Sequence, residues 1–361
     1  MASSTPWPLD SLYLTPTVHT VHLSVNASSP SSVSLPFPEK KAKYYEHLQS
    51  AVDVVERACR LCVDVQKSLF SSDGQIIEKL DQTPVTIADF GVQALVSLEM
   101  GKLFPSIPLV AEEDSAFVRE NNLVDDVVKV VTDKSSISEK ALSRENVLKA
   151  IDRGGKDAYS FGPEPATYWI LDPIDGTRGF VKGSGALYVV GLALVVEGEI
   201  VLGVMGCPNW RDRDSNASDD TLIRSGIIMI SHVGCGTWRT RLWDAENSEN
   251  TKTARKWTRC VVDDFRHVGE ARFCIPESQT WESLPLSTNL CKYLMVASGR
   301  ASVFVLRART RTIIKVSDWK GSELDFAADQ TERRVLYPSG GGVLVSNASL
   351  HNPILEIISS S

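Results

Sequence analysis

Long hydrophobic runs are missing from this 361-residue sequence: no stretch approaches the ~20 consecutive apolar residues that a membrane-spanning helix needs. A basic balance is missing too, because the formal net charge is −7. Binding to a nucleic-acid polymer usually needs a basic face that neutralises backbone phosphates. We therefore expect a soluble protein without a membrane or nucleic-acid partner. With 43% hydrophobic residues, it can bury a sizeable core spread over about two lobes.

The regular cysteine spacing of disulfide-rich secreted domains is also missing. The chain has seven cysteines, an odd number, and they are scattered along the sequence. A reduced compartment is the simpler interpretation. Cys59 and Cys62 form a C-x-x-C, but both fall on the apolar stripe of a predicted helix. No second cysteine or histidine pair is spaced to complete a zinc site. We predict that both thiols pack in the core.

Lysine and arginine are absent before Lys40, and residues 1–39 are rich in serine, threonine and proline. Such a composition does not favour a packed core and is typical of a targeting segment or a loose tail. An organellar location follows, in a plastid or a mitochondrion, with an untargeted cytoplasmic protein as the alternative. The missing arginine slightly favours the plastid, because mitochondrial presequences are usually rich in arginine.

Beyond Lys40 the hydrophobic pattern alternates between helix and strand periods. Apolar residues at helical spacing from Leu48 to Leu69 predict a long amphipathic helix, and a second helix is expected over 87–104. Strands are expected over 76–77, 109–111, 168–171, 187–196, 200–205 and 303–306. The polar segment 123–148 suggests a weakly helical insertion on the surface. We expect an α/β fold with a metal-binding lobe over 40–181 and a second lobe over 182–361.

The most informative segment is Asp172-Pro173-Ile174-Asp175-Gly176-Thr177, which follows an apolar strand. We expect Pro173 to end the strand's hydrogen bonding, because proline has no N–H group. Two carboxylates and the Ile174 carbonyl can then converge on a hard cation such as Mg²⁺, which prefers oxygen ligands. The turn at Gly176-Thr177 exposes N–H groups that suit a phosphate. An ordinary turn between strands is the alternative.

Two further acidic positions strengthen the metal interpretation. Glu112-Glu113 follows the apolar run 109–111, at the kind of sheet edge where α/β proteins bind ligands. A solvated acidic loop is the alternative there. Asp89 stands three residues after Thr86, and this pair also fits a capping box that would begin the second helix whatever the protein does.

Taken together, these segments resemble the inositol-monophosphatase-like family. Residues 83–86 with Asp89, then Glu112-Glu113, then 172–177 match three metal motifs of that family in order and spacing. The resemblance covers about Lys40 to the C-terminus. It implies the layered αβαβα sandwich of the sugar-phosphatase type, with two α/β lobes, and Mg²⁺-dependent hydrolysis of a phosphomonoester.

Within the family, the nucleotidases are the better match. Arg178-Gly179-Phe180 follows the D-G-T, where inositol phosphatases tend to have Asn-Phe. Segment 203–209 is similar to a nucleotidase G-x-x-G-C-P-N, and Lys292-Tyr293 matches a K-Y whose lysine helps to hold the nucleotide. The implied substrate is 3′-phosphoadenosine 5′-phosphate. A further candidate is 3′-phosphoadenosine 5′-phosphosulfate. An inositol or other sugar phosphatase is the alternative.

The resemblance also implies a role for each matching residue. Asp89 and Thr177 would orient and activate a water molecule. Two or three Mg²⁺ ions are expected, with Li⁺ as an inhibitor, in a monomer that acts on a small molecule. The implied metal ligands are Glu112, Asp172, the Ile174 carbonyl and Asp175. The implied substrate contacts are Gly176, Thr177, Lys292 and Arg307, the last offset by about one residue from the family's arginine.

One family motif is missing, the W-D-x-A-A-G whose aspartate is a further metal ligand. Lys315 continues directly into a segment, Val316 to Asp325, that resembles the sequence normally found after this motif. We interpret this as an internal deletion of roughly a helix and a strand near 315–316. Replacement of the ligand by Asp318 is the alternative. Because losing a carboxylate weakens a metal site and disturbs its geometry, we expect impaired activity, or nucleotide and metal binding without turnover.

Overall fold

The computed structural model describes residues 33–71, 77–78, 84–137, 142–159, 167–183, 185–210, 226–243, 255–274, 289–307, 317–318, 342–346 and 348–360. The expected deletion point at 315–316 lies outside these residues. None of the described helices is both long and apolar enough to cross a membrane.

The helical and strand elements alternate along the chain. The helices are η1 (Glu39–Lys41), α1 (Tyr45–Ser71), α2 (Ile87–Leu103), α3 (Ser115–Glu120), α4 (Val124–Thr132), α5 (Arg144–Gly154), η3 (Lys156–Tyr159), α6 (Thr177–Lys182), η4 (Val268–Glu270), α7 (Asn289–Ala297) and α8 (Ala348–Ser359). The strands are β1 (Ile77–Glu78), β2 (Pro84–Val85), β3 (Leu109–Val110), β4 (Tyr168–Asp175), β5 (Val189–Val196), β6 (Glu199–Cys207), β7 (Ile227–His232), β8 (Gly236–Arg241), β9 (Thr258–Cys260), β10 (Phe273–Cys274), β11 (Val303–Arg307), β12 (Ser317–Asp318) and β13 (Gly342–Ser346).

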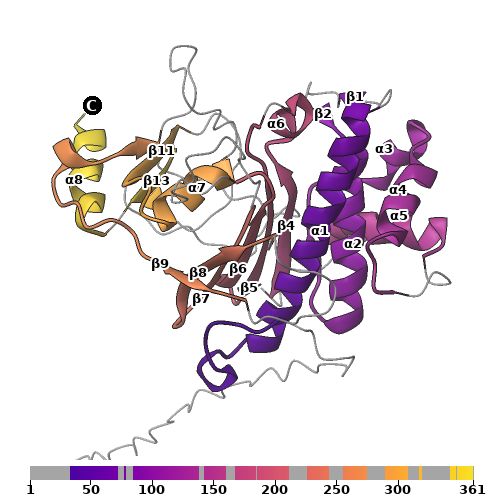
Figure 1. Cartoon of the computed structure of the whole chain (residues 1–361), viewed down its shortest axis with the longest axis horizontal. Helices are drawn as coiled ribbons and strands as arrows, with labels where there is room; N and C mark the ends of the chain where they lie inside the picture. Colours follow the sequence, from indigo (N-terminus) through magenta and orange to yellow (C-terminus); the bar gives the residue numbers. More distant parts are fainter. Residues whose placement is uncertain are drawn as a thin grey trace, which may run out of the picture.

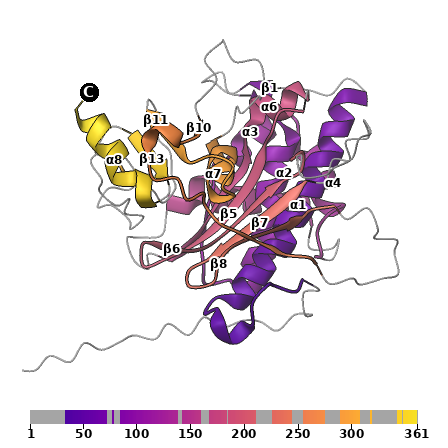
Figure 2. The same cartoon turned by 60° about the vertical axis from the view of Figure 1, so that its left-hand side comes forward.

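Five successive layers form the predicted αβαβα stack, and three shorter helices pack on one outer side of it (Figure 1). Helix α8 lies outside a four-stranded sheet with the order β10-β11-β13-β12. Helix α7 lies between that sheet and a seven-stranded sheet with the order β3-β4-β5-β6-β7-β8-β9. Helices α1 and α2 cover the other face of the larger sheet, and α3, α4 and α5 lie beyond α2. Figure 2, turned by 60°, again shows α8 beside β11 and β13, and α7 between these strands and the large sheet.

The seven-stranded sheet is antiparallel except at one edge, where β3 and β4 run parallel. Side chains alternate between its faces, as the period of two requires. On β5, Val190 and Leu192 pack against α1 and α2, whereas Val189 belongs to a second cluster around α7. The predicted lobe boundary at 181/182 falls between β4 and β5, which are hydrogen-bonded neighbours in this sheet. The sheet therefore continues across that boundary.

The predicted core role of Cys59 and Cys62 is confirmed. Both side chains are fully buried on α1, in the cluster between this helix and the large sheet. A glycine on the facing strand makes the close approach possible, because a Cβ atom added at Gly206 would lie 2.3 Å from Cys59 Sγ. Helix α1 begins at Tyr45 and α2 ends at Leu103, close to the predicted limits.

The packed chain starts earlier than the predicted end of the tail at residue 39. Val33, Leu35 and Phe37 are all buried in the main core. Backbone groups of this segment are bonded to the body, since the Val33 carbonyl accepts from Gln49 Nε2 at 2.6 Å and the Ser34 carbonyl accepts from Trp257 Nε1 at 2.8 Å. Alternate apolar residues among the serines and prolines carry this packing.

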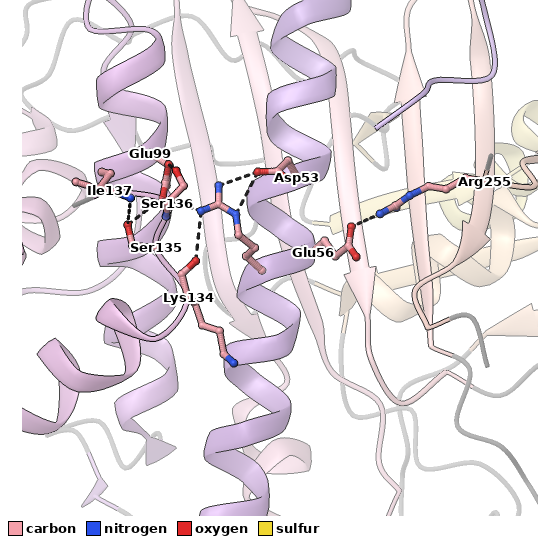
Figure 3. A network of polar contacts seen from close by, with 9 residues as sticks. Asp53, Glu56, Glu99, Lys134, Ser135, Ser136, Ile137 and Arg255 are labelled. Atoms are coloured by element: carbon pink, nitrogen blue, oxygen red, sulfur yellow. Dashed lines mark hydrogen bonds and ion pairs between the residues drawn. The ribbon is translucent and has the colours of Figure 1, made fainter. Parts of the chain in front are cut away.

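The described residues of segment 123–148, which are 123–137 and 142–148, pack more extensively than their polar composition suggests. Helices α4 and α5 bury Val127, Val131 and Val147 in a third apolar cluster against α2. A polar network then ties the end of α4 to α1 and α2, with the buried carboxylate of Glu99 at its centre (Figure 3). The expected surface insertion is therefore an integral helical layer whose few apolar residues recur at helical spacing.

Strand β4 runs through Pro173 to Asp175, so the expected end of the strand at Asp172 is wrong, but its pairing with β5 is interrupted at residues 173–174, as the proline predicted. Its pairing with β5 shifts register between Asp172 and Asp175. A proline is tolerated at such an irregularity because no ladder N–H group is required there. The irregularity brings the two aspartates to the same end of the sheet while the strand continues.

Candidate functional site

The acidic residues singled out in the sequence lie where elements begin or end. Asp89 is in the first turn of α2, Glu112 follows β3, and Asp172 and Asp175 lie in the last half of β4. Because β3 and β4 are parallel neighbours, their carboxyl ends point the same way, and Glu112 and the two aspartates lie at the same end of these strands. The structure therefore assembles the sequence motifs at one end of the large sheet.

Asp89 both caps helix α2 and contacts the loop after β4, the two roles that the sequence left open. Its Oδ2 accepts from the Thr86 backbone N–H and the Thr86 hydroxyl, each at 2.8 Å, which completes the capping box of α2. Its Oδ1 accepts from the Thr177 hydroxyl at 3.4 Å. The cap fixes the carboxylate at the helix start, and one oxygen still reaches the loop after β4. Capping and a functional contact are therefore compatible.

The loop after β4 is shaped by one glycine and one hydroxyl. Gly176 has φ 96°, in the left-handed region that favours glycine, and it precedes the short helix α6. The Gly176 carbonyl accepts from Gly179 and Phe180, which begins that helix. The Thr177 hydroxyl also lies 3.1 Å from the Ile174 carbonyl. Thr177 thus links the β4 irregularity to Asp89.

Negative charge is concentrated around Asp172. Burial raises the pKa of Asp172 well above its ordinary value, and the charges of Asp175 and Glu112 raise it further. Asp89 and Glu113 act in the same direction. A bound cation offsets this kind of repulsion and favours ionised carboxylates. The electrostatics are those of a site suited to cations.

The chemistry of the donors fits Mg²⁺, but their arrangement does not form a closed ligand cage. Over the described ranges, no three aspartate, glutamate, histidine or cysteine side chains are grouped so as to hold a metal ion. Glu112 is exposed, and the Ile174 carbonyl is engaged by Thr177. The carboxylates lie within electrostatic range of Asp172 without converging on one point. The metal ligands therefore stay a prediction.

Asp175 joins this edge of the sheet to α7. Its Oδ2 accepts the Leu290 backbone N–H at 2.6 Å, in the first turn of α7. Lys292, two residues on, is 3% exposed, and its Nζ lies 5.3 Å from the centroid of the Phe304 ring. Burial lowers the pKa of Lys292, while the charge of Asp175 opposes that shift. Lys292 is therefore near the acidic cluster but buried.

The remaining predicted contacts are less defined. Arg307 is the last residue of β11, and Asp318 ends the short strand β12 that pairs with β13. The side chains of both lie outside the described part of the structure. Their roles as a substrate contact and as an alternative ligand stay predictions.

Several residues that organise the site were missed by sequence reasoning. Gln93 binds the backbone of the acidic turn, Gly155 packs directly against it, and the Leu290 N–H group binds Asp175. The spacing of Gln93, four residues after Asp89, was a usable signal because it places both side chains on one helix face. The other two contacts join segments far apart in sequence and gave no local signal.

Comparisons with known proteins agree with this architecture. A model of the inositol monophosphatase family matches residues 44–328. A protein of Arabidopsis thaliana that carries the provisional name of a mitochondrial 3′(2′),5′-bisphosphate nucleotidase is 57% identical over 370 residues, covering 91% of this chain and 90% of its own length. A 3′,5′-bisphosphate nucleotidase of the same plant is 45% identical over 175 residues, which is 46% of this chain and 48% of that protein.

The fold also matches a solved structure. An inositol monophosphatase of Thermotoga maritima superimposes with a TM-score of 0.51 at 16% identity, covering 87% of this chain and 97% of that one. The alignment with the 57%-identical plant protein contains gaps in this chain. Since 91% of 361 residues is about 330, about 40 of the 370 aligned positions have no counterpart here. The comparison does not place these positions along the sequence, so the internal deletion near 315–316 stays a prediction.

Proposed function

Because the chain belongs to the inositol monophosphatase family, we propose that it is a Mg²⁺-dependent 3′(2′),5′-bisphosphate nucleotidase. It would hydrolyse the 3′-phosphate of 3′-phosphoadenosine 5′-phosphate to give AMP and phosphate. The observation that carries the proposal is the cluster of acids around Asp172 at the end of the large sheet. The name of the plant relative with 57% identity over most of both chains supports the nucleotidase over other members of the family.

The acidic cluster would hold Mg²⁺ through Glu112, Asp172 and Asp175, with the Ile174 carbonyl as a further oxygen donor. When bound, Mg²⁺ supplies charge compensation for the phosphate and lowers the pKa of a water molecule. Hard cations prefer such oxygen donors, and the repulsion at Asp172 is the energetic reason for this chain to bind one.

Thr177 and Asp89 would orient the attacking water. The Thr177 hydroxyl lies 3.4 Å from Asp89 Oδ1 and 3.1 Å from the Ile174 carbonyl, and its single hydrogen donates to one of them at a time. When it donates to Asp89, a proton can pass from water through this hydroxyl to the carboxylate. Asp89 is held for this task by Thr86, which binds its other oxygen. A lone carboxylate is a weak base at neutral pH, so Asp89 depends on the relay and on the charge compensation described above.

The substrate would lie over the loop after β4. N–H groups at Gly176 and Thr177 begin helix α6, where intrahelical partners are lacking and a phosphate oxygen can be accepted. Lys292 would add positive charge from α7, and Arg307 would contact a nucleotide phosphate. The sequence Arg178-Gly179-Phe180 favours a bisphosphonucleoside over an inositol phosphate. Comparing hydrolysis of the two substrate types tests this choice.

A second candidate is a nucleotide- and metal-binding variant without turnover. The absent W-D-x-A-A-G motif and the roughly 40 unmatched positions favour it. A missing carboxylate ligand weakens Mg²⁺ binding, and a misplaced cation costs rate even when substrate still binds. Equilibrium binding of the nucleotide without phosphate release would support this candidate.

We also propose that the chain acts in an organelle. The 57%-identical relative is named mitochondrial, which favours the mitochondrion over the plastid that the arginine-poor start of the sequence suggested. A fluorescent protein fused after residue 45 would report the location. Cytoplasmic fluorescence would contradict the proposal.

The direct test of function is phosphate release by the purified chain from 3′-phosphoadenosine 5′-phosphate, with and without Mg²⁺. Turnover that needs Mg²⁺, is inhibited by Li⁺ and is lost in Asp172→Asn is expected. Equal turnover of an inositol phosphate would favour the broader sugar-phosphatase alternative. Tight nucleotide binding without release would favour the inactive variant.

A further inference from the structure

The acidic turn that carries Glu112 is held by a buried amide on α2. Gln93 is fully buried, and its Nε2 donates to the carbonyls of Glu113 at 2.7 Å and Ile151 at 2.8 Å. Its Oε1 accepts the Glu113 N–H at 2.8 Å. A glutamine amide has two donor hydrogens and one acceptor oxygen, so each of these groups is used. Two of the three bonds fix the backbone of Glu113.

Helix α5 supports the same turn from the other side. The Ala111 N–H donates to the Gly154 carbonyl at 2.7 Å, and the Ser115 N–H donates to Asp152 Oδ1 at 3.1 Å. A Cβ atom added at Gly155 would lie only 1.9 Å from the Glu113 carbonyl oxygen. The turn thus passes between α2 and the end of α5 with no room for displacement.

These contacts place Glu112 relative to Asp89. Gln93 and Asp89 lie four residues apart on α2, hence on one face of the helix. Glu112 lies between Ala111 and Glu113, whose backbone N–H groups are both bonded. The backbone position from which the Glu112 side chain starts is therefore fixed relative to α2, the helix that carries Asp89.

We propose that Gln93 is a positioning residue for the metal site, and that it acts by holding the backbone of Glu112-Glu113 between α2 and α5. The inference rests on the proposed function, in which Glu112 is a Mg²⁺ ligand. Ligands need to be held within about 0.5 Å of the productive geometry, which an exposed side chain achieves only from a fixed backbone. The buried amide supplies that fixed backbone.

Loss of this support is expected to lower Mg²⁺ affinity in addition to its cost to the stability of the fold, since the three bonds of Gln93 are buried. Residues that orient metal ligands typically change metal affinity by about 10–100-fold when they are replaced. We expect the Mg²⁺ concentration for half-saturation to rise about tenfold in Gln93→Met, which keeps the length of the side chain but removes its three hydrogen bonds.

The test compares three variants of the full-length chain. Gln93→Met removes the amide. Gly155→Ala displaces the turn from the α5 side and leaves Gln93 intact. Ser97→Ala is the matched control, because Ser97 lies one turn further along α2, is 1% exposed, and has a hydroxyl with no hydrogen-bond partner among the described residues. Mg²⁺ binding is followed without turnover, by the rise in melting temperature across a Mg²⁺ titration, and then by phosphate release.

Half-saturation by Mg²⁺ is expected to rise about tenfold in Gln93→Met and Gly155→Ala, and to stay unchanged in Ser97→Ala. A lower melting temperature with wild-type Mg²⁺ half-saturation in both variants would overturn the inference, because Gln93 would then serve the fold alone. If Gln93→Met does not fold, Gly155→Ala decides by the same criterion. If neither the melting temperature nor the turnover of the wild-type chain changes with Mg²⁺ concentration, the proposed function and this inference are both overturned.

Discussion

Replacing Arg57 with methionine should destabilise the protein through a carboxylate far from the proposed site. Arg57 Nη1 donates to Glu99 Oε1 at 2.6 Å, and its Nη2 donates to Asp53 at 2.8 Å (Figure 3). Glu99 is 3% exposed and also accepts from the backbone N–H and the hydroxyl of Ser136 and from the Ser135 hydroxyl. The variant leaves a buried carboxylate whose remaining donors are neutral.

The magnitude follows from this geometry. Breaking a buried ion pair by removing one partner costs about 3–5 kcal/mol. The three serine hydrogen bonds and the partial exposure of Arg57 reduce that figure, so we expect about 2–3 kcal/mol. Methionine keeps the apolar stem of the side chain, which limits the loss of packing. At roughly 1.3 °C per kcal/mol for a chain of 361 residues, the melting temperature should fall by about 3–4 °C.

The assay is urea unfolding at pH 7 and at lower pH, with Lys149→Met as the control. Lys149 pairs with Glu145 on the surface of α5, and such exposed pairs contribute less than about 1 kcal/mol. Burial opposes ionisation of Glu99, but the hydrogen bonds from Arg57 and Ser136 outweigh it and lower its pKa below the ordinary 4.5.

A lowered carboxyl pKa contributes stability that is present above pH 4.5 and is lost as the pH falls through the folded-state pKa. The difference in free energy of unfolding between wild type and Arg57→Met should therefore be largest at pH 7 and should decrease below about pH 4.5. A gap at pH 7 no larger than that of Lys149→Met would refute this reasoning.

Two further predictions concern the core. Burial lowers the pKa of His47 from 6.5 to about 4, so the unfolded chain binds a proton that the folded chain does not, and wild-type stability should fall between pH 6.5 and 4. Urea unfolding of wild type and His47→Phe at pH 7 and pH 5 measures this. Between these pH values His47→Phe should lose about 1–2 kcal/mol less unfolding free energy than wild type, and an equal loss would contradict the lowered pKa of His47. Gly206→Ala should cost about 1–3 kcal/mol because its methyl group would overlap Cys59 Sγ. Cys59→Ala in the same chain should recover part of that cost, and simple additivity of the two changes would speak against the overlap.

The parts of the fold that local sequence patterns encode were predictable. The 3.6-residue period gave α1 and α2 within a few residues, and apolar runs located the large-sheet strands β3 to β6. The family motifs indicated the five-layer architecture, because such motifs occur on a shared fold. Their acids were expected at one sheet edge, and the structure brings Asp89, Glu112, Asp172 and Asp175 within electrostatic range there.

Other features depend on contacts between distant segments. The early start of the packed chain depends on Val33 and Phe37 meeting a sheet that forms much later in the sequence. The continuation of β4 through Pro173 depends on its neighbour β5, which accommodates a shift in register. Gly155 is required by the Glu113 carbonyl on another turn. Local composition does not contain this information.

The most direct test of the central claim is phosphate release from 3′-phosphoadenosine 5′-phosphate across a Mg²⁺ titration, with the wild-type chain and Asp172→Asn side by side. The account predicts release that depends on Mg²⁺ in the wild type and is lost in Asp172→Asn, with both proteins folded. Folded wild-type protein that binds the nucleotide but releases no phosphate at any Mg²⁺ concentration would contradict it.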